Sequence, residues 1–222
     1  MRIFLSLAAS VLSLTLSAQT VARMNDLKPE QKAAATNLKL TGQLSTSGNS
    51  DFRQLRDLCY QLRHVDLSLA DCENIPNNAF HSRPVLETIV LPTQVKSIGS
   101  QAFFACHSLR NITLPKSVTR VGDAAFSSCE NLKEITIEGN PMLGEFAFAR
   151  LKGLRTVRVN AAEPPVAAVS AFEGIDRKKV KLIVPRGSEL KYRKAAGWSR
   201  FFSTPENQNR LCNPAEVLLP QP

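Results

Sequence analysis

Few side chains in this sequence could do covalent chemistry, since its 222 residues include only three histidines and five cysteines. The neighbours Cys106 and His107 pair a thiol with an imidazole, the two groups of a cysteine nucleophile and its general base. Adjacent side chains in a turn usually point apart, so this pair does not predict a catalytic dyad. The chain also lacks G-x-S-x-G, H-E-x-x-H, C-x-x-C and a glycine-rich phosphate loop. We therefore predict no enzyme activity, no catalytic residues, no cofactor and no metal site.

Two of the cysteines belong instead to a repeat of 23 residues. The segments 86–108, 109–131 and, less perfectly, 132–153 align at this offset. The aligned sets are Leu86, Leu109 and Leu132, then Pro92 and Pro115, Gly99 and Gly122, Phe103 and Phe126, and Cys106 and Cys129. A fixed period of this length is typical of a solenoid, in which each coil buries its apolar face against its neighbours.

Further copies flank these three, at 62–85 and 154–180, and every copy contains an Ala-Phe pair. The pairs are Ala79-Phe80, Ala102-Phe103, Ala125-Phe126, Ala147-Phe148 and Ala171-Phe172. Each copy opens with L-x-x-I-x-L, which predicts a short strand with one buried face. Proline ends the strand in the clearest copies, and a second apolar segment and a glycine turn follow. We expect the Ala-Phe pair to pack inward.

The pattern L-x-x-I-x-L-P-x-x-V-x-x-I-G-x-x-A-F-x-x-C resembles the BspA-like class of leucine-rich repeats, found in surface and secreted proteins of anaerobic bacteria. The resemblance covers roughly residues 37 to 204. It implies an α/β leucine-rich repeat solenoid that is right-handed and β-rich, with short parallel strands. About five coils of 22–27 residues would lie between an N-terminal and a C-terminal cap.

The first 18 residues have the features of a secretory signal peptide, with Arg2, an apolar run from Ile3 to Leu16 and a small residue, Ala18, before the expected cleavage. We predict no transmembrane segment, because this run is shorter than the ~20 residues that span a bilayer. Export predicts a secreted, cell-surface or periplasmic protein. The other segments are expected to be a linker (19–36), an N-terminal cap (37–61), the repeats (62–180), a C-terminal cap (181–204) and a tail (205–222).

Five cysteines in an exported protein suggest disulfides. We expect Cys106 and Cys129 to be small buried groups in adjacent coils, although a bond between them stays open. Cys59 and Cys72, near the N-terminal cap, are the pair better placed for a disulfide. Cys212 has no obvious partner and could be free or join two chains.

The outward positions of L-x-x-I-x-L would form three columns across the strands. The resemblance implies that this face binds the ligand, as in leucine-rich repeat proteins generally. Its residues are polar and mixed in charge, without the aromatic anchors that binding hot spots favour. The candidate binding residues on this face are Arg63, His64, Asp66, Glu87, Thr88, Arg110, Asn111, Thr113, Lys133, Glu134, Arg155 and Arg158.

A second candidate surface is a basic end. Residues 150–200 hold 13 Lys or Arg and 4 Asp or Glu, so they carry the entire net charge of +9. This charge could be merely solvated, or it could attract an anionic partner. The candidate residues are Arg177, Lys178, Lys179, Lys181, Lys191, Arg193 and Lys194. We do not expect nucleic acid, because the protein is exported and lacks aromatic residues interleaved with the charges.

These features favour an exported, adhesin-like binding module that contacts a protein or a glycan, with an anionic ligand suiting the basic end. The contact would use the strand face, the basic end or both. The alternative is a periplasmic structural protein that scaffolds other proteins of the same cell. The sequence leaves the oligomeric state open.

Overall fold

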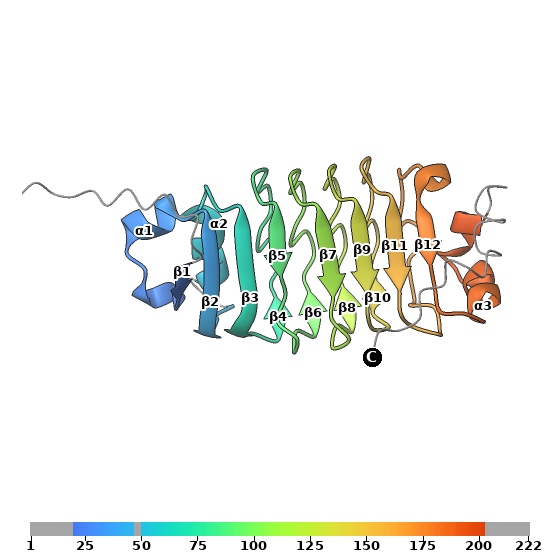
Figure 1. Ribbon diagram of the computed structural model, residues 1–222, viewed down its shortest axis with the longest axis horizontal. Coiled ribbons are helices and arrows are strands. Elements are labelled where there is room, and N and C mark those ends of the chain that lie inside the picture. Colours follow the sequence, from blue (N-terminus) through green and yellow to red (C-terminus); the bar gives the residue numbers. More distant parts are fainter. Residues whose placement is uncertain (1–19, 47–49, 203–222) are drawn as a thin grey trace, which may run out of the picture.

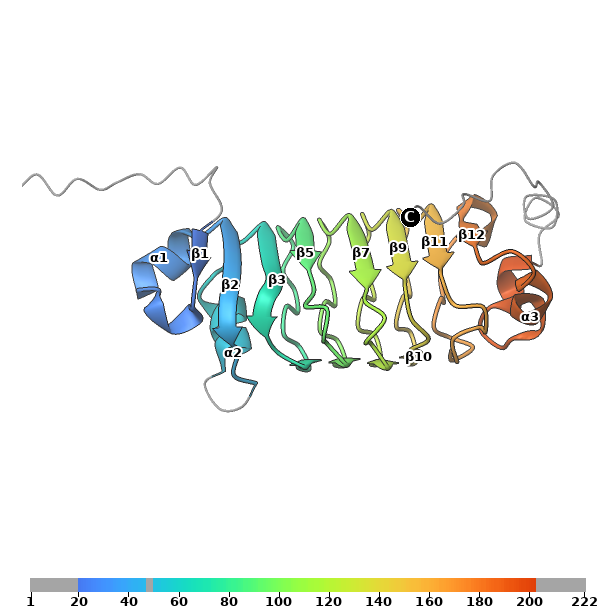
Figure 2. The same cartoon turned by 60° about the horizontal axis from the view of Figure 1, so that its bottom comes forward.

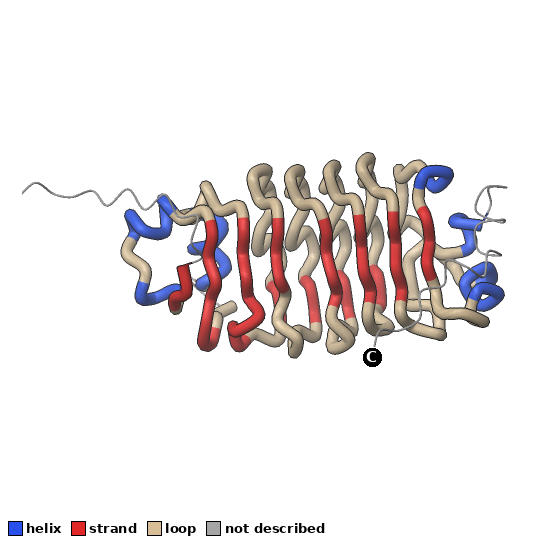
Figure 3. Tube along the Cα trace, in the orientation of Figure 1, coloured by secondary structure: helices blue, strands red, loops and turns tan. Residues whose placement is uncertain are grey.

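The computed structural model describes residues 20–46 and 50–202. Its coils stack along one long axis, with strands and turns in the middle and helices at the two ends (Figures 1 and 3). The strands are β1 (Thr20–Ala22), β2 (Asn37–Gln43), β3 (His64–Asp71), β4 (Asn74–Ile75), β5 (Thr88–Val90), β6 (Ser97–Ile98), β7 (Asn111–Leu114), β8 (Arg120–Val121), β9 (Glu134–Ile137), β10 (Met142–Leu143), β11 (Thr156–Val159) and β12 (Lys181–Ile183). The helices are η1 (Met24–Asp26), α1 (Pro29–Ala34), α2 (Asp51–Asp57), η2 (Arg177–Lys179), α3 (Glu189–Lys194) and η3 (Ser199–Phe202).

The longer strands form two parallel sheets that continue one another along one face of the stack (Figure 1). Their orders are β1-β2-β3-β5 and β7-β9-β11-β12, and between them the Arg110 N–H donates to the Glu87 carbonyl over 3.2 Å. Each strand lies one repeat along from the last, so that Ile112 is in register with Ile135. This arrangement confirms the predicted leucine-rich repeat solenoid of short parallel strands.

The second apolar segment of each coil also forms a parallel sheet, in the order β10-β8-β6-β4. A glycine follows β6 and β8, as the repeat pattern predicts. A Cβ on Gly99 would lie 2.5 Å from the backbone nitrogen of Asn77, and one on Gly122 would lie 2.5 Å from that of Ser100. These glycines are therefore needed because the preceding coil passes too close for any side chain. In the fifth coil the strand is reduced to a single bridge between Leu143 and Ala167.

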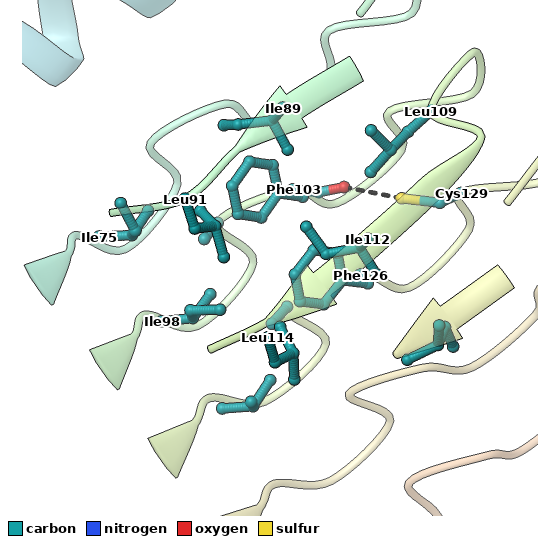
Figure 4. Close-up of a cluster of buried hydrophobic side chains, with 14 of the residues drawn as sticks. Ile75, Ile89, Leu91, Ile98, Phe103, Leu109, Ile112, Leu114, Phe126 and Cys129 are labelled. Atoms are coloured by element: carbon teal, nitrogen blue, oxygen red, sulfur yellow. Dashed lines mark hydrogen bonds between the residues drawn. The ribbon is translucent and has the colours of Figure 1, made fainter. Parts of the chain in front are cut away.

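The phenylalanines of the five Ala-Phe pairs form a continuous stack through the core. The ring centroids of neighbouring coils are 5.2, 4.9, 5.2 and 5.5 Å apart, in order from Phe80 to Phe172. Strand residues such as Ile89 and Leu114 pack around these rings (Figure 4). The predicted inward packing of the Ala-Phe pairs is confirmed, and it gives each coil the same ring contact with its two neighbours.

In the first three repeats, the third residue after the phenylalanine connects its coil to the preceding part of the chain by side-chain hydrogen bonds. The buried thiols of Cys106 and Cys129 donate to the carbonyls of Phe80 and Phe103, over 3.1 and 3.0 Å. In the first coil this position holds Arg83, whose buried guanidinium donates to the carbonyls of Arg56, over 2.6 Å, and of Cys59. Arg83 therefore joins the first repeat to the end of α2.

The N-terminal cap begins earlier than the sequence suggests. The segment that we expect to be a linker, 19–36, contains β1, η1 and α1. β1 pairs with β2, and Met24 and Leu27 are buried in the common core. The reason is that the outer face of β2 would otherwise expose apolar surface, and this segment covers it. The expected N-terminal cap, 37–61, contains β2 and α2, and Phe52 of α2 packs edge-on against Phe80 with centroids 6.1 Å apart.

The C-terminal cap ends the stack with aromatic side chains. Phe201 packs edge-on against the last ring of the stack, Phe172, with centroids 5.1 Å apart. The buried indole of Trp198 donates to the Pro165 carbonyl, and the Tyr192 hydroxyl donates to that of Ala161, each over 2.7 Å. These bonds attach the cap to the loop of the fifth coil that contains Pro164 and Pro165.

Cys59 and Cys72, the pair better placed for a disulfide, are not bonded to each other. Both thiols are free and buried, as are those of Cys106 and Cys129. Each cysteine is instead a small apolar group of the core. Cys212, the signal peptide (1–18) and the tail (205–222) lie outside the described residues. Within the described residues, no helix has the length and apolar character needed to cross a membrane.

Candidate functional site

The strand face is the solvent-facing side of β2, β3, β5, β7, β9, β11 and β12. Alternate residues of each strand point into the core, so the residues between them point outward. Strand pairing aligns His64 with Thr88, and Glu134 with both Asn111 and Thr156. The same registers align Asp66 with Val90 and Thr136 with Arg158. All the candidate residues on this face are exposed or half-buried, and they follow the predicted columns.

The columns are longer than the sequence pattern suggests. At one end, Asn37 aligns with His64 and Lys39 with Asp66, so β2 adds another row. At the other end, Lys181 of β12 aligns with Thr156. The alternation in Leu38-Lys39-Leu40 could have revealed the first of these rows, but Lys181 lies in a charged run without that signal. The strand face therefore reaches into the basic end.

The N-terminal half of the strand face has its charges paired. Lys39 lies 2.8 Å from Asp66, and Glu87 is 2.7 Å from Arg63 and 3.3 Å from Arg110. The hydrogen bond from Arg63 lowers the pKa of Glu87 below its usual value, with a further effect of Arg110. Burial alone would raise the pKa of Asp66, but bonds from Lys39 and Ser68 outweigh it and lower that pKa. These carboxylates neutralise the cations around them.

The C-terminal half of the strand face has more cations than anions. Lys133 and Arg155 are exposed in the first column, and Arg158 is half-buried in the third. Among the described residues, neither Lys133 nor Arg158 has an ion-pair partner, and the Arg155 guanidinium donates only to the carbonyl of Leu154, over 2.9 Å. The half-buried Glu138 lies directly after β9, and Glu134 is the carboxylate within that strand. Its surroundings are Asn111, Thr113, Thr136 and Thr156, which offer amide and hydroxyl groups.

The basic end divides into structural and exposed residues. Arg177 is half-buried, because it donates to the Phe172 carbonyl over 2.7 Å and lies over the ring of Phe201. This burial lowers the pKa of Arg177. Lys179 pairs with Asp176 at 3.0 Å, and Lys191 pairs with Glu163.

The other candidate residues of the basic end differ from one another in how exposed their side chains are. Arg193 lies over the ring of Phe202, with its guanidinium carbon 4.9 Å from the centroid. Lys178 and Lys194 are exposed. The dense run of charges in the sequence is thus spread over a helix, a strand and their caps, and much of it supports the fold.

The exposed large apolar side chains of the strand face lie in its N-terminal half, whereas Ile183 of β12, beside Arg158, is half-buried. Leu69 is 57% exposed at the end of β3, and Val90 is 47% exposed on β5. The outward residues of β7, β9 and β11 are polar or charged. The two halves of the face therefore differ in both charge and apolar character.

The Cys106 and His107 pair has no catalytic geometry. The thiol of Cys106 is buried and bonds the Phe80 carbonyl, whereas the ring of His107 is exposed and bonds the Ser128 carbonyl over 3.1 Å. Among the residues that the structure describes, no three His, Cys, Asp or Glu side chains are grouped so that they could hold a metal ion. The strand face is consequently the candidate functional site.

A family model and two solved structures are similar to parts of this chain. A model of the BspA type leucine rich repeat region matches residues 73–182, with six copies. No curated protein matches the chain. A crystal structure of a leucine-rich repeat protein from T. pallidum is 24% identical, with a TM-score of 0.45, and the match covers 57% of this chain and 60% of that one. One from Bacteroides ovatus is 19% identical, with a TM-score of 0.42, over 70% of this chain and 42% of that one.

This chain thus spans less than two thirds of either solved protein. Leucine-rich repeats typically mediate protein binding, and the fold is generally non-catalytic. The repeats at 73–182 carry the strands, glycines and phenylalanines of the stack described above. The chain belongs to the BspA type leucine-rich repeat family.

Proposed function

We propose that this protein is an exported, non-catalytic binding module that contacts a protein or a glycan outside the cell in the manner of an adhesin. The supporting observation is the strand face, where polar side chains stand in register over successive strands and no helix of the described chain covers them (Figure 2). A rigid stack holds these groups at fixed spacing, so little conformational entropy is lost when a ligand binds. Export rests on the signal-like segment 1–18.

An array experiment tests this function. The chain from Gln19 to Pro222 is applied to matrix proteins and to neutral and anionic glycans, at low and at physiological salt. We expect selective binding, and we expect Lys133→Glu with Arg158→Glu to abolish it. A control variant, Lys178→Glu with Lys194→Glu, changes the charge equally at the basic end. Failure of the unmodified chain to bind any extracellular target would argue against a binding module of this kind.

A periplasmic scaffold is the second candidate, and the observation that favours it is the open edge of β1. This strand pairs with β2 on one side, and its other edge has no strand beside it among the described residues. Such an edge can accept a strand from another molecule. A scaffold of this type should form concentration-dependent assemblies in light scattering. Val21→Pro in β1 should remove an N–H and weaken them, whereas the strand-face variant should not.

A further inference from the structure

The strand face from β7 to β12 has the chemistry of a site for one class of ligand. We propose that it binds a linear anionic polysaccharide, laid across the strands. This proposal deepens the proposed function and rests on it, since it requires that the strand face be a binding surface. It depends on the charge balance, on the polar groups between the charges and on the absence of an apolar anchor.

The charge balance separates this half of the face from the other. Toward the N-terminus, Lys39 and Arg63 are held by Asp66 and Glu87 and have little attraction left for a ligand. On β9 and β11, Lys133, Arg155 and Arg158 outnumber the two carboxylates, Glu134 and the Glu138 that directly follows β9. Lys181 extends the same columns on β12. A polyanion is therefore attracted to the C-terminal half specifically.

The groups between these cations suit a polysaccharide. Asn111 and Thr113 on β7, Thr136 on β9 and Thr156 on β11 can donate and accept hydrogen bonds, as sugar hydroxyls do. Three intervals between parallel strands separate β7 from β12, about 14 Å in all. An extended ligand can thus place anionic groups against successive strands.

The same surface is poorly suited to a protein partner. Binding hot spots in protein interfaces are enriched in tryptophan and tyrosine that fill apolar pockets. The outward residues of β7, β9 and β11 include no aromatic or large apolar side chain, and Ile183, the outward apolar residue of β12, is half-buried. The exposed Leu69 and Val90 lie on β3 and β5. Cations and hydroxyls without an anchor favour an anionic glycan over an acidic protein.

Isothermal titration of the chain 19–222 with dextran sulfate tests the inference. Neutral dextran of the same length is the control ligand, hyaluronan replaces sulfate by carboxylate, and polyglutamate represents an acidic protein. We expect dextran sulfate, hyaluronan or both to bind, and neutral dextran not to bind. The affinity should fall as salt rises, because exposed charges are screened over about 8 Å at physiological ionic strength.

Two matched triple variants locate the site. Lys133→Gln, Arg155→Gln and Arg158→Gln together should weaken binding about tenfold, since each exposed ion pair contributes a factor of roughly two to three. Lys28→Gln, Arg120→Gln and Arg150→Gln remove the same charge from exposed positions outside both candidate surfaces and should change affinity less than twofold by the same reasoning. Circular dichroism and urea unfolding would confirm that both variants keep the fold.

Four outcomes would overturn the inference. Equal weakening by the two triple variants would mean attraction to net charge alone. Equal or tighter binding of polyglutamate would mean an acidic protein as the ligand. Binding of an extracellular protein on the array, but of neither anionic glycan, would refute the inference and leave the proposed function standing, whereas no binding in either experiment would refute both.

Discussion

The rings of Phe103 and Phe126 lie parallel, with centroids 4.9 Å apart and 6° between their planes, although 23 residues separate them in the chain. Each ring also stacks on the next coil outward, on Phe80 at 5.2 Å and on Phe148 at 5.2 Å. The separation is close to the spacing of neighbouring strands. Residues that are one repeat apart in the sequence are thus in direct contact in the core.

Truncation of a ring in the middle of this stack should be costly. We expect Phe126→Ala to lower the free energy of unfolding by about 3–5 kcal/mol, because it leaves a cavity between two rings that cannot close without moving whole coils. Urea unfolding followed by the fluorescence of the single, buried Trp198 measures this. Phe146→Ala is the control, since that ring is 44% exposed. A comparable loss in both variants would contradict the role of the stack.

Arg83 should be essential to the joint between the first repeat and α2. Arg83→Ala would leave the carbonyls of Arg56 and Cys59 without this donor, and we expect a loss of about 2–3 kcal/mol. Arg83→Lys should recover only part of it, because an ammonium lacks the planar fork that reaches both oxygens. Arg120→Ala, on the exposed side of β8, is the control. Equal stability of the lysine variant and the unmodified chain in urea would show that the fork is unnecessary.

The buried thiols predict a pH dependence of stability. Burial raises the pKa of Cys59 to about 11, and likewise that of Cys72 to about 11. Because the pKa of each thiol is higher in the folded state, the contribution of the protonated thiol to the free energy of unfolding is fully present below the ordinary thiol pKa near 9. It is lost as the pH rises through 11. The urea midpoint should therefore fall between pH 9 and 11, and it should fall less in the double variant Cys59→Ala with Cys72→Ala.

The same burial predicts that these thiols are unreactive in the folded protein. In a Cys212→Ser background, a thiol reagent at pH 8 should label none of Cys59, Cys72, Cys106 and Cys129 until urea unfolds the chain. Four thiols should then react without a reducing agent. Release of only two thiols would mean that a disulfide forms after all.

Glu87 should restrain binding at the N-terminal half of the strand face. Glu87→Gln would free Arg63 and Arg110, and we expect dextran sulfate to bind two- to threefold more tightly as a result. The urea midpoint should hardly change, because these pairs are exposed to solvent. Glu73→Gln, which frees Lys96 beside the β4–β6 pair, is the matched control and should leave the affinity unchanged. Equal gains in both variants would mean that the position of the charge is irrelevant.

Much of the fold could be predicted from the sequence because a repeat states each structural requirement several times. The recurrence of leucine, glycine and the Ala-Phe pair predicted the strands, the close approach at Gly99 and Gly122 and the buried rings, and all are present. The alternation in each strand also predicted the outward columns. These features depend on residues nearby in the chain or at the same position of the adjacent repeat, and the repeat pattern gives the identity of both.

Features that occur once were harder to predict. Residues 20–36 carry no repeat signal, and their packing on β2 depends on the apolar surface that the first coil leaves uncovered. Arg83 stands where the next two coils have cysteine, and the sequence does not say that the end of α2 lies within its reach. The cysteines near the N-terminal cap suggested a disulfide, but each is held by its own packing in the core.

By itself the sequence determined the solenoid, its period and the side chains that face solvent, because these follow from spacing along one chain. The tertiary structure alone decided how the charges are shared among coils. Glu87 meets cations from the coils on both sides, Arg177 turns onto Phe201, and Lys133 and Arg158 have no carboxylate within ion-pair distance among the described residues. Ion pairing depends on distances between coils of a few ångström, and no pattern within one repeat specifies them.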